Sequence, residues 1–106
     1  KFPRSIKNKA TSLKIQTNKT YDIKKISKSI IKEFNNLYSY YDKRNYGKII
    51  GGWKKYSHTL GKTIKAKTLT GTYTGKAVDV DEECNLILRL NDGTVKRIME
   101  GDIFIV

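Results

Sequence analysis

The chain has 106 residues and a formal net charge of +12, and 38% of its residues are hydrophobic. This size fits one modest domain or a larger fragment with a small module, and its seven Tyr, three Phe and one Trp argue against disorder. The apolar runs are far shorter than the roughly 18 residues of a membrane span, and the single Cys excludes an internal disulfide and fits a reducing cytoplasm. Residues 1–60 hold fifteen of the 22 basic and three of the 10 acidic residues, so they carry the whole charge excess.

Residues 1–60 predict an ordered loop followed by two helices. Residues 1–20 lack a sustained period and are anchored by Leu13 and Ile15. From Asp22, which suits an N-cap or an acid of the first turn, apolar residues recur at intervals of three and four, and this spacing predicts a helix ending near residues 45–47. A second, shorter helix fits residues 46–60, with Gly61 as the residue that closes it. Its apolar face consists of Ile49, Ile50, Trp53, Tyr56 and Leu60.

After Gly61 the apolar period changes to two, which is typical of strands. Five segments qualify, and the second is expected to bend at Ala77: TIKAKTL, TYTGKAVDV, NLILRL, DGTVKRIM and GDIFIV. The Asp92-Gly93 pair is a strong hairpin signal. The predicted fold is therefore α+β, with a boundary between Leu60 and Gly61 and a small SH3-like β-barrel over residues 61–106.

The stretch AVDVDEECNL is the first candidate site, because it gathers four acids beside the single Cys. Asp79, Asp81 and Glu83 fit the first positions of a calcium loop, but Cys84 stands where Gly is needed and Leu90 where a bidentate Glu is needed. One Cys and one distant His cannot build a tetrahedral zinc site. We therefore interpret the stretch as a hairpin turn and predict no metal site.

Other candidate residues have structural interpretations. His58 is expected to cap helix carbonyls, and Cys84 is expected to be inert. The tyrosines could stack on nucleic-acid bases, but Tyr38, Tyr41 and Tyr56 are expected to pack the helices. The sequence contains no phosphate-binding glycine loop and no zinc-protease motif.

Three segments in order resemble the C-terminal half of a biotin protein ligase. FPRSIKNKATSLKI resembles the loop of the catalytic domain that carries Ala-Thr-Ser-Leu/Met-Lys. YDIKKISKSIIKEFNNLY with WKKYSHTLGKTIKAKT resembles the last two helices and the entry into the final module. GKAVDVDEECNLILRLNDGTVKRIMEGDIFIV resembles that module, in which residues 79–85 form a hairpin and Cys84 replaces a Gly.

The resemblance implies a two-step enzyme. Biotin and ATP, with Mg²⁺, form biotinyl-5′-AMP, and biotin then passes to a Lys of a biotin carboxyl carrier domain. The family's Arg/Gly-rich loop and its catalytic Lys precede the matching region, so no catalytic residue is assigned in residues 1–106. The implied partners are the carrier domain and the N-terminal half of the ligase, with a homodimer left open, and the implied location is cytoplasmic.

The resemblance also implies binding residues. Ala10, Thr11, Ser12 and Leu13 match the loop that orders over the adenosine side of the intermediate, although some ligases place an aromatic residue where Ala10 stands. Asp102 matches an acid that faces the ATP site in some ligases. The Arg that accompanies this acid in those ligases falls at Val106, which is a departure from the pattern.

Two other functions remain open from the residues alone. A basic nucleic-acid-binding module would show a steep salt dependence of binding, although the neutral second part and the excess of Lys over Arg argue against it. A protein-docking adaptor would bind a partner along a sheet edge without any effect of nucleotide.

Overall fold

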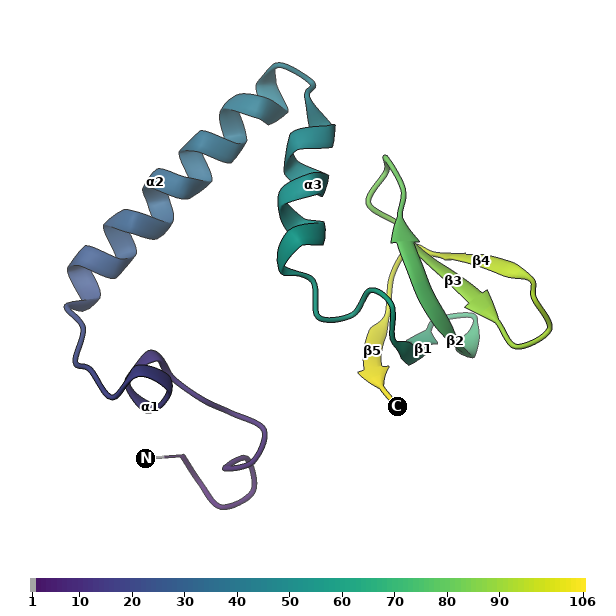
Figure 1. Cartoon of the computed structure of the whole chain (residues 1–106), viewed down its shortest axis with the longest axis horizontal. Helices are drawn as coiled ribbons and strands as arrows, with labels where there is room; N and C mark the ends of the chain where they lie inside the picture. Colours follow the sequence, from purple (N-terminus) through teal and green to yellow (C-terminus); the bar gives the residue numbers. More distant parts are fainter. Residues whose placement is uncertain (1) are drawn as a thin grey trace. The chain divides into compact units, whose positions relative to one another are not determined.

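A computed structural model describes residues 2–106, which contain three helices and five strands (Figure 1). The helices are α1 (Leu13–Thr17), α2 (Ile23–Asp42) and α3 (Tyr46–Tyr56). The chain divides into two compact units, Lys1–Tyr38 and Ser39–Val106, so that α3 belongs to the same unit as the strands. Within residues 2–106, no helix combines the length and the apolar character that crossing a membrane requires.

A short helix, α1, forms where the sequence predicts only a loop. Ser12 has extended backbone angles, and its Oγ accepts a hydrogen bond from the N–H of Ile15 at 3.2 Å, so it is the N-cap. Asn18 ends the helix in the left-handed region with φ 54°, and its N–H donates to the carbonyl of Lys14. Capping at both ends supports a helix that is too short to show an apolar period.

The predicted long helix is confirmed as α2. Asp22 Oδ1 accepts a hydrogen bond from the N–H of Lys24 at 2.9 Å, which confirms Asp22 as the N-terminal cap. The helix ends at Asp42, before the predicted residues 45–47, because Arg44 adopts a left-handed φ of 56° and donates its N–H to the carbonyl of Tyr41.

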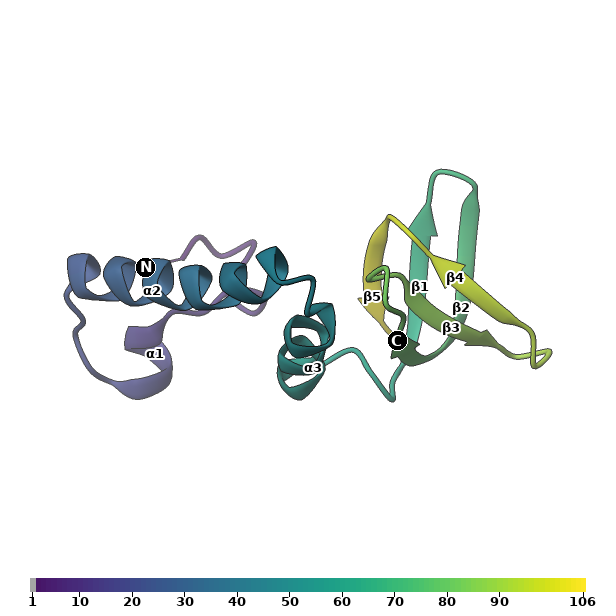
Figure 2. The ribbon, with the colours of Figure 1, turned by 90° about the horizontal axis from the view of Figure 1, so that it is seen from above.

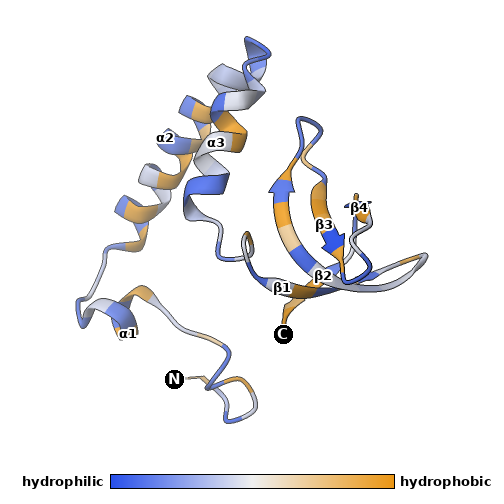
Figure 3. Ribbon diagram, turned by 45° about the vertical axis from the view of Figure 1, so that its right-hand side comes forward, coloured by the Kyte–Doolittle hydropathy of each residue, from blue (hydrophilic) through white to orange (hydrophobic). Residues whose placement is uncertain are grey.

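The apolar stripe of α2 is exposed. None of its residues is buried, and Ile23, Ile30 and Phe34 are 80%, 64% and 62% exposed. Figure 3 shows hydrophobic bands alternating with hydrophilic ones along this helix. An amphipathic helix in a protein gains most of its stability when its apolar face packs against another surface. The exposed stripe of α2 is therefore a face suited to cover another apolar surface.

The predicted second helix is confirmed as α3, but it is shorter than expected. It ends at Tyr56, and Ser57 donates its N–H to the carbonyl of Lys54. The prediction that Gly61 closes this helix is wrong. Gly61 has a φ of 82°, but it lies after the helix has ended and donates its N–H to the carbonyl of Ala77, so it belongs to the entry into the sheet.

The five predicted strands are confirmed and form one antiparallel sheet with the order β4-β3-β2-β1-β5. Their bounds are β1 (Thr63–Thr68), β2 (Gly71–Val80), β3 (Leu86–Leu90), β4 (Val95–Ile98) and β5 (Asp102–Ile105). Figure 2 shows that this sheet is strongly twisted and curved. Since β4 and β5 stand at the two ends of the strand order, closure into an SH3-like barrel stays a prediction.

The core of the second unit lies inside this sheet. Its buried residues come from four strands: Ile64, Ala66, Ala77, Leu88 and Ile98. Gly75 allows β2 and β3 to approach closely, because a Cβ atom there would collide with the carbonyl oxygen of Arg89. The absence of a side chain at Gly75 therefore lets β2 and β3 pair closely beside the buried cluster.

A β-bulge confirms the bend predicted at Ala77. The pairing register between β2 and β3 shifts between Ala77 and Asp79. Alternation from Ala77 would turn Asp79 inward, but the extra residue, Val78, leaves Asp79 exposed and makes Val80 the next buried position.

Candidate functional site

The loop before α1 and the first residue of that helix carry four of the five residues to which the resemblance assigns a binding role. The N–H of Ala10 donates to the carbonyl of Ile6 at 2.9 Å. Thr11 Oγ1 accepts a hydrogen bond from Gln16 Nε2 at 2.7 Å, and Ser12 caps α1. Thr11, Ser12 and Leu13 are all exposed, so the loop has defined hydroxyl positions and an accessible surface.

The fifth predicted residue, Asp102, lies in the other compact unit. It is the first residue of β5 and pairs with Lys67 of β1 across the antiparallel ladder. Its side chain is exposed. At the end of the same strand, the N–H of Val106 donates to the carbonyl of Thr63 at 3.1 Å, so the C-terminal segment is tied to β1.

The acidic stretch forms the predicted turn between β2 and β3. Asp81 Oδ1 accepts hydrogen bonds from the backbone N–H groups of Glu83 at 3.0 Å and Asn85 at 2.9 Å. Asp81 Oδ2 accepts from the Asn85 side-chain amide at 3.2 Å and lies 2.9 Å from Nε of Arg97 on β4. The acid is therefore used to fold the hairpin, and Asn85, a buried polar residue, has its amide satisfied.

Three aspartates of this unit have lowered pKa values. The hydrogen bond from Lys54 is the main cause at Asp79, and the hydrogen bond from the Thr94 side chain is the main cause at Asp92. At Asp81, desolvation acts to raise the pKa, but hydrogen bonds from Asn85 and Glu83 and the charge of Arg97 outweigh it, so the pKa is lowered. These carboxylates are stabilised in their charged form.

Neither the turn nor any other part of residues 2–106 offers a set of metal ligands. The described residues contain no group of three or more His, Cys, Asp or Glu side chains that could hold a metal ion. At the turn, the oxygens of Asp81 are already shared among Asn85, Glu83 and Arg97. The side chains of this segment therefore do not fit a Mg²⁺ ion, and no step is assigned to one here.

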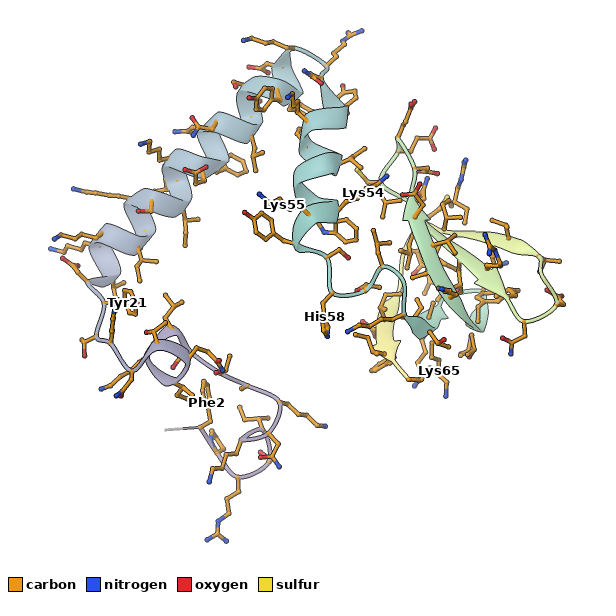
Figure 4. The ribbon with its side chains drawn as sticks, viewed as in Figure 1. Phe2, Tyr21, Lys54, Lys55, His58 and Lys65 are labelled. Atoms are coloured by element: carbon orange, nitrogen blue, oxygen red, sulfur yellow. The ribbon has the colours of Figure 1, made fainter. Side chains whose placement is uncertain are left out.

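Two residues with structural interpretations lie near the ends of their elements. His58, labelled in Figure 4, follows the end of α3, and its Nε2 lies 2.7 Å from Nζ of Lys62, so the capping of helix carbonyls stays a prediction. Cys84 is exposed, as a turn residue can be, and it adopts a left-handed φ of 65°. Gly tolerates this conformation and other residues adopt it at a cost, so the backbone here suits the Gly that the resemblance places at this position; the expected inertness of Cys84 stays a prediction.

The prediction that three tyrosines pack the helices holds only in part. The ring of Tyr38 stacks on Phe34 with centroids 6.1 Å apart, and the ring of Tyr41 lies 5.7 Å from that of Tyr46. Tyr56 is 82% exposed, so the prediction is wrong for this residue. It is the last residue of α3, beyond the turn that carries the buried Ile50.

An apolar groove of about 340 Å³ in the second unit was not predicted from the sequence. Ile49, Ile50 and Trp53 of α3 line it together with Val80, Leu86 and Ile103 of the sheet. At the same helix, Nζ of Lys54 forms an ion pair with Oδ1 of Asp79 at 2.6 Å. Figure 4 shows Lys54 on the side of α3 nearer the strands and Lys55 on the other side.

Comparison with known proteins finds similarity to biotin protein ligases. Residues 59–106 match the model of the biotin protein ligase C terminal domain. Two relatives named bifunctional ligase/repressor BirA, from Bacillus subtilis (strain 168) and Bacillus spizizenii, are 33% and 32% identical over 102 residues, which is 96% of this chain. Together these matches support a C-terminal fragment of a biotin protein ligase. It spans 31% of the length of each of these relatives.

Solved ligase structures share the fold. The biotin protein ligase from Aquifex aeolicus in complex with biotin and ATP covers the whole chain with a TM-score of 0.87 at 24% identity, and the chain covers 45% of that protein. An apo structure of the A. aeolicus ligase gives a TM-score of 0.88 at 23% identity and 48% coverage. The chain thus has the fold of part of a ligase, with helices followed by a five-stranded antiparallel sheet, and the comparisons do not favour a nucleic-acid-binding module.

Proposed function

We propose that the chain acts as the C-terminal part of an enzyme that activates biotin with ATP to biotinyl-5′-AMP and transfers biotin to a lysine of a carboxyl carrier protein. The observation that carries this proposal is the match to two BirA proteins along 96% of the chain. The activity belongs to the complete ligase, because the catalytic loop and Lys of the family precede the matching region.

Within this enzyme, residues 1–60 would complete the catalytic domain, and residues 61–106 would form the SH3-like C-terminal domain. The exposed stripe of α2 supports the first assignment, because a catalytic sheet is the kind of apolar surface that such a helix covers. The order of the five strands supports the second, because closing β4 on β5 would give a small barrel.

The loop Ala10–Leu13 would contact the adenosine side of biotinyl-5′-AMP. Its support is local: Thr11 and Ser12 are exposed, and hydrogen bonds to α1 fix their hydroxyl groups before a ligand arrives. Asp102, exposed at the start of β5, would face the ATP site. As the resemblance implies, Mg²⁺ would enter with ATP.

The proposed partners are the biotin carboxyl carrier domain and the N-terminal half of the ligase, and the proposed location is the cytoplasm. A second copy of the chain in a homodimer is a further candidate partner. The similarity to biotin protein ligases supports all of these proposals.

The test is a Thr11→Val substitution in the complete ligase. Because the variant loses the hydroxyl group but keeps its shape, we expect a higher KM for ATP with little change in the KM for biotin. Thr20→Val, in the exposed segment between α1 and α2, is the matched control and should leave both values unchanged. Equal effects of the two substitutions would remove Thr11 from the binding site, and a complete ligase without biotinylating activity would contradict the proposed function itself.

A further inference from the structure

Helix α3 is held against the sheet by few contacts. Ile50 is its buried residue, and Trp53, one turn further along, is 48% exposed. The apolar groove of about 340 Å³ remains between these side chains and Val80 and Leu86 of the sheet. Because unfilled apolar space forfeits packing energy, apolar contacts alone hold this helix weakly and leave its direction poorly specified.

The bulge in β2 supplies a specific contact for α3. It gives Asp79 an exposed position and turns Val80 toward the groove. Asp79 Oδ1 then accepts a hydrogen bond from the N–H of Val80 at 2.8 Å and pairs with Lys54 Nζ at 2.6 Å. The carboxylate is therefore held by its own backbone while it binds the helix.

The side chains of this pair are 36% and 58% exposed. Exposed ion pairs contribute little to global stability, so a large effect on folding is not expected from this contact. The ion pair can nevertheless select a single direction for a weakly held helix. The Asp79 carboxylate is fixed, so the pair stabilises only the orientation of α3 that brings Lys54 to this carboxylate.

We propose that Lys54 and Asp79 are positioning residues that fix the direction in which α3 leaves the C-terminal sheet. Since α3 is the last helix before the sheet, the pair sets the angle between this sheet and whatever part of the ligase precedes α3. The geometry carries the inference, and neither biotin nor ATP is needed to test it, so it can fail while the proposed function stands.

Trp53 makes the test direct, because it is the single tryptophan of the chain and it lines the groove. In the 106-residue chain, Lys54→Met and Asp79→Asn should each shift Trp53 emission to longer wavelength and raise its quenching by acrylamide. The ratio of docked to undocked α3 should fall about two- to fivefold, which is the range for an exposed ion pair. The midpoint of thermal unfolding of the sheet, measured by circular dichroism, should change little.

Two further variants separate orientation from general damage. Lys55→Met, on the other side of α3, should leave Trp53 fluorescence unchanged. The exchanged pair Lys54→Asp with Asp79→Lys should restore quenching toward that of the parent chain, and the double variant Lys54→Met/Asp79→Asn should be no worse than either single one. The inference is overturned if Lys55→Met changes Trp53 fluorescence as much as Lys54→Met does. It is also overturned if the effects of Lys54→Met and Asp79→Asn on quenching add fully in the double variant and the exchanged pair does not restore the quenching of the parent chain.

Discussion

Helix α2 and the five-stranded sheet use apolar residues in opposite ways. In α2 the stripe has Ile, Phe and Tyr at the correct spacing, but none of its residues is buried. In the sheet, smaller residues such as Ala66 and Ala77 are fully buried beside Ile64 and Leu88. Burial therefore follows from the available partner surfaces rather than from hydrophobicity alone: the strands bury their apolar residues among themselves, whereas the stripe of α2 is exposed.

The largest expected effect tests the core of the sheet. Leu88→Ala removes a fully buried side chain and leaves a cavity, so we expect a loss of about 2–5 kcal/mol in the free energy of unfolding. Urea unfolding followed by circular dichroism measures it. Leu69→Ala is the control, because Leu69 is 93% exposed at the β1–β2 turn. A loss at Leu69 equal to that at Leu88 would contradict the assigned core.

The next effect concerns the acidic turn that joins β2 to β3. Asn85→Ala removes a buried side chain whose amide donates to Asp81 and Glu83, and we expect a loss of about 1–3 kcal/mol. The same urea titration measures it, with Asn91→Ala in the exposed β3–β4 turn as the control. If Asn85→Ala is neutral, the turn does not depend on this network.

At the same turn, Cys84→Gly should stabilise the sheet. Cys84 has a φ of 65°, and relief of the left-handed strain exceeds the entropy lost by Gly, so we expect a gain of about 0.5–1 kcal/mol. Cys84→Ala keeps the strain and should be neutral. Equal unfolding midpoints for the Gly and Ala variants would show that the backbone at residue 84 relaxes without cost.

Acid should weaken the sheet through the same carboxylates. The pKa values of Asp79, Asp81 and Asp92 are lowered from the usual 3.8 in the folded chain. Their stabilising contribution is therefore complete above pH 3.8, and it is lost as the pH falls from this value through the folded pKa values. Melting temperatures measured from pH 6 to pH 2 should fall in that window. Replacing all three aspartates by Asn should make the decrease of the melting temperature with falling pH smaller.

The smallest effect on stability is expected in α2. Ile30→Gln with Phe34→Gln changes side chains that are already exposed, so the unfolding of the sheet should shift by less than about 0.5 kcal/mol. Self-association measured by sedimentation should decrease, because an exposed apolar face is removed. Lys28→Gln, a polar control on the same helix, should leave association unchanged. A loss of sheet stability in the double variant would show that α2 already has a partner surface within the chain.

Local chemistry explains what the sequence predicts well. The Asp92-Gly93 turn, the Asp22 cap and the five strands depend on residues close together in the chain, and all appear in the structure. Helix α1 was missed because five residues are too few for a period, although the Ser12 cap was a visible signal. The pairing of Lys54 with Asp79 joins residues 25 positions apart through a bulge, and neither charge indicates its partner in the sequence. The binding roles of Ala10–Leu13 and Asp102 stay predictions.

The bulge in β2 also means that the strand tolerates a change in length at one place. With Val78 deleted, Ala77 and Asp79 would be neighbours, β2 and β3 could pair in an uninterrupted ladder, and Asp79 and Val80 would stay opposite Ile87 and Leu86 on their present faces. A residue deleted from the regular part of the strand, between Gly71 and Ala77, would instead turn the side chains on one side of the deletion to the opposite face. Natural variants of this strand should therefore differ in length at the bulge before they differ in length elsewhere.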